Sequence, residues 1–329
     1  MPHAPSPDDC SDDLSAELLR SDVKKAQGLS FRQKEKLQYA LLLIPGCLLY
    51  GIFNLLPLIG TLVLSFFDWP GIGPATFVGF DNFTKLLTDE YMSGQLWNAF
   101  QQTFVFFAIC ISLFLVLGTS FALLLSWNTA GKSAYKLLFF MPYPLAAVAV
   151  AFLGQLIVDV RGPLNQLMMH WDLISSPLMF LGEADTALPT IALFQSWQKL
   201  GFSIMLILSA ILGVRADLLE AAVLDGASRW QCIRHVVFPV LAPAFVLITI
   251  LTMVDVFNNA EYVLILMGPD AGPYYSTDIL GTFQYRTAFG TSGGSGTADL
   301  GMAAAIGMVI SVLILPATIY LALRNMRNR

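Results

Sequence analysis

The stretch from Phe100 to Trp127 reads FQQTFVFFAICISLFLVLGTSFALLLSW and contains no charged side chain. A run of about 20 predominantly apolar residues is long enough to cross the hydrocarbon core of a bilayer as a helix. Within that core only helices and closed barrels satisfy their backbone hydrogen bonds. The stretch therefore predicts a transmembrane helix and decides the fold class.

Five further apolar segments flank this one. The six predicted spans are Tyr39–Phe67, Phe100–Trp127, Leu137–Val158, Leu188–Leu212, Val240–Met267 and Met302–Leu323. The 329 residues are 56% hydrophobic and only 12% charged, about half of the roughly 25% charge of soluble domains. We therefore predict an all-α integral membrane protein with six transmembrane helices. Its parts are an N-terminal tail (1–36), a membrane domain (37–323) and a C-terminal tail (324–329).

Basic residues are distributed unevenly between the segments that connect the spans. One side of the predicted topology holds Arg20, Lys24, Lys25, Arg32, Lys34, Lys36, Lys132, Lys136, Arg215, Arg229, Arg234, Arg324, Arg327 and Arg329. The other side holds only Lys85, Arg161 and Arg286. Because Lys and Arg concentrate in cytoplasmic loops, we expect both termini and the connection after the fourth span to be cytoplasmic.

This connection, residues 214–239, has strong local signals. Asp217 is placed to cap a short helix, and Gly226 suits the left-handed turn that ends one. Ser228 with Gln231 three residues later fits a capping box that begins a second helix. Pro239 lies where it would start or kink the fifth span.

The first of these helices is unusually apolar for a cytoplasmic loop. Leu218, Leu219, Ala222 and Val223 would share one face. Exposed apolar patches commonly mark interaction sites. On these residues alone, packing of the face against the protein's own bundle is favoured over docking on a partner.

The spacing of residues in this loop resembles a known family. Glu220-Ala221-Ala222, Gly226 and the pair Phe238-Pro239 look like the EAA signature of the permeases of ABC importers. The continuation through Asp225 to Ser228 and Trp230 is similar to the carbohydrate branch. Weaker resemblances, in the family's order, are Val78-Gly-Phe-Asp-Asn-Phe83, Pro142 with Pro144, Gly162-Pro-Leu-Asn165, Ser196-Trp197, Gly201-Phe202 and Gly301-Met-Ala-Ala-Ala305.

The resemblance implies a type I ABC importer permease fold (MetI-like), in the maltose and glycerol-phosphate permease branch. It implies that Glu220, Ala221, Ala222, Asp225, Gly226 and Pro239 couple the chain to an ATPase. The implied partners are a second homologous permease, two ATP-binding subunits and an extracytoplasmic solute-binding protein, in a bacterial cytoplasmic membrane. The implied substrates are mono- or oligosaccharides, or glycerol phosphates. No cofactor is expected in this chain, since the partner subunits bind ATP, and no nucleic acid is expected as a partner.

Ionisable residues inside predicted spans are candidates for the substrate pathway. Lys199 and Asp255 are predicted at nearly equal depth, so they either pair or line one polar cavity; an ion pair that only fixes helix packing is the alternative. Asn258 and Asn259 are expected on the same helical face as Asp255. Glu261, Asn54, Gln195 and Gln198 are weaker candidates for this cavity.

Two other protein classes compete with the importer. A stand-alone secondary transporter would need its own ion site and often has internal repeats, which the sequence does not reveal. An intramembrane enzyme would need a nucleophile with a base, and no such constellation is visible. His3, His170 and His235 are too dispersed for a metal site. We therefore expect neither catalytic residues nor a metal.

Overall fold

The computed structural model describes residues 39, 42–127, 131–291 and 298–327, and these are mostly helical. The chain divides into two compact units, Met1–Gly60 and Thr61–Arg329. The predicted N-terminal tail, residues 1–36, lies outside the described residues. In the first unit, residues 42–50 are α-helical and lead into a π-helical turn, η1 (Gly51–Leu55). Helix α2 (Leu56–Leu64) then continues across the boundary between the units.

The second unit contains one small hairpin and a bundle of long helices. In chain order its elements are β1 (Phe67–Asp68), β2 (Thr76–Phe77), α3 (Asp81–Thr88), α4 (Glu90–Ser126), α5 (Lys132–Phe140), α6 (Ala147–Val158), α7 (Pro163–His170), α8 (Ala184–Leu212), α9 (Ala216–Leu224), α10 (Arg229–Cys232), η2 (Ile233–Val237), α11 (Phe238–Asn258), α12 (Glu261–Met267), α13 (Leu280–Phe289) and α14 (Leu300–Arg327). The two strands pair in antiparallel fashion.

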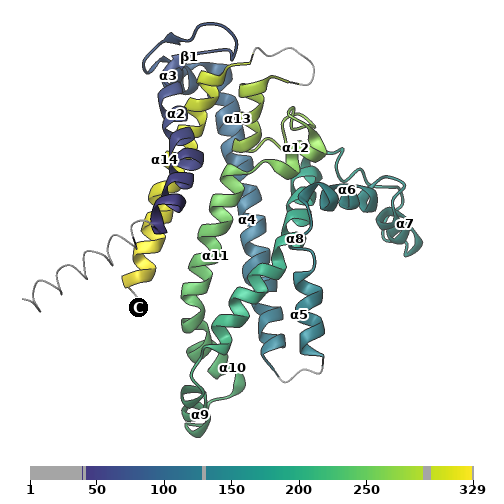
Figure 1. The fold of residues 1–329 in the computed structure, drawn as a ribbon. Coiled ribbons are helices and arrows are strands. Elements are labelled where there is room, and N and C mark those ends of the chain that lie inside the picture. Colours follow the sequence, from purple (N-terminus) through teal and green to yellow (C-terminus); the bar gives the residue numbers. More distant parts are fainter. Residues whose placement is uncertain (1–38, 40–41, 128–130, 292–297, 328–329) are drawn as a thin grey trace, which may run out of the picture. The chain divides into compact units, whose positions relative to one another are not determined.

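Helices α4, α8 and α11 form the centre of this unit and pack against one another (Figure 1). The buried residues of α4 recur every three to four positions and include Ala99, Thr103, Phe106, Cys110 and Phe114. This spacing places them on one face of the helix. Helix α14 packs against α11 and α13.

Opposite ends of the second unit hold different kinds of element. Helices α9 and α10 lie at one end, and the hairpin, α3 and α13 lie at the other (Figure 1). The loop that carries the EAA-like residues therefore lies at the opposite end of the unit from α13.

The structure contains six helices that are long and apolar enough to cross a membrane, among the described residues. They are Leu42–Leu64, Glu90–Ser126, Ala147–His170, Ala184–Leu212, Arg229–Asn258 and Leu300–Met326. The predicted number and the all-α class are confirmed. Helix α14 continues to Arg327, past the position at which the last span was expected to end.

Two predicted spans are interrupted. Leu137–Val158 was expected as one helix, but α5 ends at Phe140 and α6 begins only at Ala147. Pro142 and Pro144 lie in the break, because proline lacks an N–H group and disfavours a helical residue before it. Val240–Met267 was also expected to be continuous, but α11 ends at Asn258 and α12 begins at Glu261.

Two prolines nearer to helix starts are accommodated without a break. Pro57 follows the π-helical turn η1 by two residues, and Pro239 follows η2 by two residues. A π-helical turn adds a residue to the helix. We interpret each turn as the local adjustment to the hydrogen bond that the proline cannot donate.

Candidate functional site

Helix α9 carries the EAA-like residues and ends in a Schellman motif. The Gly226 N–H donates to the Val223 carbonyl (3.0 Å), and the Ala227 N–H donates to the Ala222 carbonyl (2.9 Å). Gly226 has φ +80°, in the left-handed region that favours glycine. Asp225 is the C-cap residue. The spacing between Ala222 and Gly226 is therefore that of a helix and its terminating turn.

The second half of the loop follows the predicted caps. The Ser228 hydroxyl accepts from the Gln231 N–H (3.4 Å), and the Gln231 side chain accepts from the Ser228 N–H (2.7 Å). This capping box begins α10 as expected. Pro239 lies in the first turn of α11, directly after the π-helical turn η2 that adjusts to its missing N–H donor. The predicted cap of α9 is wrong: Arg215 is the N-cap residue, and Asp217 instead pairs with its guanidinium (2.9 Å).

The outer surface of α9 is exposed. Glu220 and Ala221 are exposed, Ala222 is half-buried, and Glu220 forms no ion pair among the described residues. Leu218, Val223 and Leu224 are exposed on the same helix, with Leu224 88% exposed, and Trp230 is exposed on α10. Leu219 packs towards the core instead. The apolar face therefore divides into a side packed on the bundle and a larger side left open.

A second candidate site lies between α8 and α11, within the predicted spans. The Lys199 ammonium is 2.5 Å from the Asp255 Oδ2. The Gln195 amide, one turn before Lys199, donates to the same oxygen (2.8 Å). The two charged side chains are 27% and 29% exposed and line a cavity of about 300 Å³. The two alternatives from the sequence thus occur together: the residues pair, and they line one cavity.

The rest of this cavity is lined by aromatic, hydroxyl and aliphatic side chains that the sequence did not indicate as part of a cavity. Phe202 on α8 stacks on Tyr143 from the α5–α6 break, with ring centroids 5.3 Å apart. Ser203 and Thr252 also line the cavity. At Gly201 an added Cβ would lie 2.1 Å from the Phe139 carbonyl oxygen, so glycine allows α8 to approach α5 closely. The signal in the sequence that could have indicated Tyr143 was its position between Pro142 and Pro144, in the break between α5 and α6.

The remaining pathway candidates do not join this cavity. Asn258 is the last residue of α11, and Asn259 has left the helix with φ −114° and ψ 122°. The predicted shared face with Asp255 is therefore wrong for Asn259, which lies outside the helix, whereas Asn258 is still in α11 three residues after Asp255. The Asn258 amide donates to the Val254 carbonyl (2.9 Å), and the Asn259 side chain accepts from the Glu261 N–H (2.9 Å).

A separate cavity of about 550 Å³ is lined by Asn258, Asn259 and Glu261, together with Gln284 and Tyr285 of α13. Gln198 has a structural position: its amide donates to the Leu145 carbonyl, and it accepts from the Tyr262 hydroxyl. Asn54 lies in η1 in the first unit, so the structure does not relate it to either cavity.

Comparison with known proteins identifies the family. The model of the family described as "binding-protein-dependent transport system inner membrane component" matches residues 115–328. The chain belongs to this family. The matched region includes α9, α10 and every residue that lines the cavity between α8 and α11 except Phe114.

Similar proteins are transport permeases. The probable starch degradation products transport system permease protein AmyD of Thermoanaerobacterium thermosulfurigenes is 29% identical over 257 residues, covering 78% of this chain and 85% of that protein. The trehalose/maltose transport system permease protein MalF of Thermococcus litoralis is 27% identical, covering 91% and 97%. The diacetylchitobiose uptake system permease protein NgcF of Streptomyces coelicolor is 28% identical, covering 85% and 79%.

A solved structure shares the fold. It is a bacterial ABC transporter involved in the import of the acidic polysaccharide alginate, with a TM-score of 0.73 and 23% sequence identity. The match covers 90% of this chain and 96% of that chain. The type I ABC importer permease fold expected from the resemblance is therefore confirmed.

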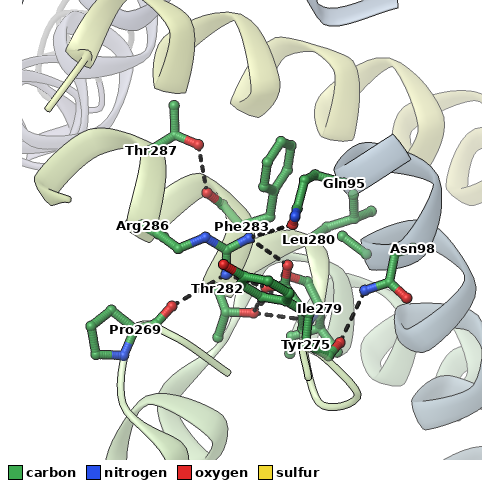
Figure 2. Close-up of polar contacts among 12 residues, drawn as sticks. Gln95, Asn98, Pro269, Tyr275, Ile279, Leu280, Thr282, Phe283, Arg286 and Thr287 are labelled. Carbon is green, nitrogen blue, oxygen red and sulfur yellow. Dashed lines mark hydrogen bonds and ion pairs between the residues drawn. The ribbon is translucent and has the colours of Figure 1, made fainter. Parts of the chain in front are cut away.

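The permease has one further polar cluster, which the sequence did not predict, in the α12–α13 connection. Arg286 donates to both carboxylate oxygens of Asp278 (3.0 and 2.6 Å). It also donates to Gln95 on α4 (3.0 Å), as Figure 2 shows. The Asn98 amide reaches the Tyr275 carbonyl (2.9 Å). These contacts attach the connection to α4.

Asp278 in this cluster is fully buried. Burial raises the pKa of the Asp278 carboxyl above its ordinary value, whereas hydrogen bonds from Arg286 and Thr282 act in the opposite direction. Sequence reasoning noticed Arg286 only as a rare basic residue on the outer side. Its partner eight residues earlier lies just before α13 begins, so the pair has no i, i+3 or i, i+4 spacing that would have revealed it.

Proposed function

We propose that this chain is the membrane-spanning permease subunit of an ATP-driven importer that moves a mono- or oligosaccharide across a bacterial cytoplasmic membrane. The observation that carries the proposal is α9: a short helix, ended by a Schellman motif, with Glu220 and an apolar surface exposed at one end of the bundle. A helix of this kind offers an exposed apolar surface on which a partner subunit can dock. The family is a transport component, so the role is transport rather than catalysis.

The proposed assembly has four further members: a second homologous permease, two ATP-binding subunits and an extracytoplasmic solute-binding protein. The α9–α10 loop, with Glu220, Ala221, Ala222, Asp225, Gly226 and Pro239, docks on an ATP-binding subunit. Closure of the ATPase dimer then moves this loop, and the core helices change the cavity from inward- to outward-facing. This chain binds no nucleotide. The loop and both termini are cytoplasmic, as the basic residues predict.

A sugar as substrate is supported by two features. Relatives named for starch degradation products, trehalose and maltose, and diacetylchitobiose cover most of this chain. The cavity at Lys199 and Asp255 also combines hydrogen-bonding groups with the stacked rings of Tyr143 and Phe202. Sugar hydroxyls both donate and accept hydrogen bonds. The alternative substrate is a glycerol phosphate.

Reconstitution of the full assembly in proteoliposomes tests this function. Wild-type uptake should require ATP, the ATP-binding subunits and the binding protein. Replacing Glu220 by Arg, or Gly226 by Val, should abolish ATP-dependent uptake, because the first reverses an exposed charge at the docking surface and the second strains the left-handed turn. The matched control is Ala75→Val, an exposed position outside this loop. Uptake by this chain alone under an ion gradient would instead establish a secondary transporter.

A further inference from the structure

The cavity between α8 and α11 contains an ion pair that is partly open to solvent. Lys199 and Gln195 both donate to Oδ2 of Asp255, and neither of these side chains engages Oδ1. The Lys199 ammonium has three donor positions, and this contact uses one. Each partner therefore keeps hydrogen-bonding capacity for a ligand while the two charges hold each other.

These two residues are the only charged ones among the described residues that line the cavity. The others are Phe114, Tyr143, Phe202, Ser203, Ile248, Leu251 and Thr252. The cavity therefore has a positive and a negative group in contact and no net charge. It also lies inside predicted spans, where an uncompensated charge is costly.

The free energy of binding in such a cavity should be much less favourable for an anionic ligand than for a neutral one. An anion loses its hydration and meets an ammonium whose charge Asp255 already neutralises, while the carboxylate repels it. A neutral polyol has hydroxyls that donate to the carboxylate or to the Thr252 hydroxyl oxygen, whose own proton goes to the Ile248 carbonyl, and that accept from the ammonium or from Ser203. It therefore replaces its lost water contacts without adding charge.

We propose that the Lys199–Asp255 pair makes the cavity selective for neutral polyhydroxylated ligands and excludes anionic ones such as uronates and glycerol phosphates. The inference rests on the proposed transport function and narrows its substrate class. It separates this chain from the alginate importer that shares its fold, whose named cargo is acidic. In this proposal the preference for neutral over anionic ligands arises because the pair has no net charge, so a substitution that gives the cavity a net charge should change this preference.

Equilibrium binding to the complete permease–ATPase assembly, without the binding protein, is the test. The neutral probes are radiolabelled maltose, trehalose and diacetylchitobiose, and the anionic probes are glycerol 3-phosphate and an alginate disaccharide. The wild type should bind at least one neutral probe about tenfold or more tighter than either anion. Asp255→Asn leaves Lys199 unpaired, so the ratio should shift towards anions by about tenfold to a hundredfold.

Two further variants separate net charge from the identity of the side chains. The exchange Lys199→Asp/Asp255→Lys keeps the cavity neutral and should keep the preference for neutral probes. Lys85→Met/Asp81→Asn removes an exposed ion pair on α3 and should change nothing. Anions bound by the wild type as tightly as neutral sugars, or an unchanged ratio in Asp255→Asn, would overturn the proposal.

ATP-dependent uptake by the same preparation, with the binding protein added, keeps the two proposals distinguishable. An assembly that shows ATP-dependent uptake but binds none of the neutral probes overturns this inference and leaves the transport function standing. Loss of ATP dependence in the wild type overturns the transport function itself. The wild-type comparison of neutral and anionic probes is decisive even if Asp255→Asn fails to assemble.

Discussion

Arg286 and Asp278 show how one residue pair can hold a connection that has little regular structure. Both side chains are at least nine-tenths buried, and the guanidinium also reaches Gln95 on α4 and the Pro269 carbonyl. Breaking a buried ion pair from one side leaves an uncompensated charge, which typically costs about 3–5 kcal/mol. The main energetic effect of the pair is therefore the cost of leaving one charge buried and unpaired, which exceeds the attraction between the two side chains.

We expect Arg286→Met to destabilise the protein by about 3–5 kcal/mol, because the Asp278 carboxylate stays buried without its partner. The double variant Arg286→Met/Asp278→Leu should recover much of that loss, since it removes both charges. Thermal unfolding of the detergent-solubilised assembly measures both. Lys85→Met is the control, because its exposed pair with Asp81 should contribute less than about 1 kcal/mol. Equal midpoints for Arg286→Met and Lys85→Met would contradict this role.

At the scale of single elements, the approach of α8 to α5 depends on Gly201. Any Cβ at this position would meet the backbone carbonyl of Phe139, which cannot move as a flexible side chain would. We expect Gly201→Ala to separate the two helices, lower stability by about 1–3 kcal/mol as an overpacked site does, and weaken ligand binding next to it. Gly94→Ala on α4 is the matched control.

Gly94 is a useful control because it is also helical and an added Cβ meets no atom within 4 Å. Alanine should stabilise α4 there by up to about 1 kcal/mol through helix propensity. Opposite signs for the two glycine substitutions in thermal unfolding are therefore expected. A Gly201→Ala variant as stable as the wild type would show that α5 and α8 do not approach as closely as the structure indicates.

Local signals in the sequence predicted some elements and not others. Caps and turns depend on residues within one helical turn, so Gly226, the Ser228–Gln231 box and the place of Pro239 near the start of α11 were predicted correctly, although the cap at Asp217 was not. The break after Asn258 was not predicted, because apolar residues continue through α12. The lining of the cavity also escaped prediction, since Tyr143, Phe202 and Thr252 come together only through packing of separate helices.

At the scale of the whole molecule, the two ends of the second unit differ, and this difference relates the features described above to the direction of transport. The exposed α9–α10 loop and the attached α12–α13 connection lie at opposite ends of the second unit (Figure 1), with the Lys199–Asp255 cavity on the helices between them. The proposed transport in one direction requires such a difference, because the ATP-binding subunit would act on one end and the solute would enter at the other. Orientation in the membrane is thus the property on which the proposed function depends.

Orientation can be measured with single cysteines in a variant whose own cysteines are replaced by serine. Ser133 and Ile72 are both exposed, and the positive-inside pattern assigns Ser133 to the cytoplasm and Ile72 to the outside. A membrane-impermeant maleimide added to intact cells should label Ile72→Cys and leave Ser133→Cys unlabelled. Permeabilised cells should label both, which controls for reactivity. Labelling of Ser133→Cys alone in intact cells would reverse the topology, and the α9 surface would then face away from any cytoplasmic ATPase.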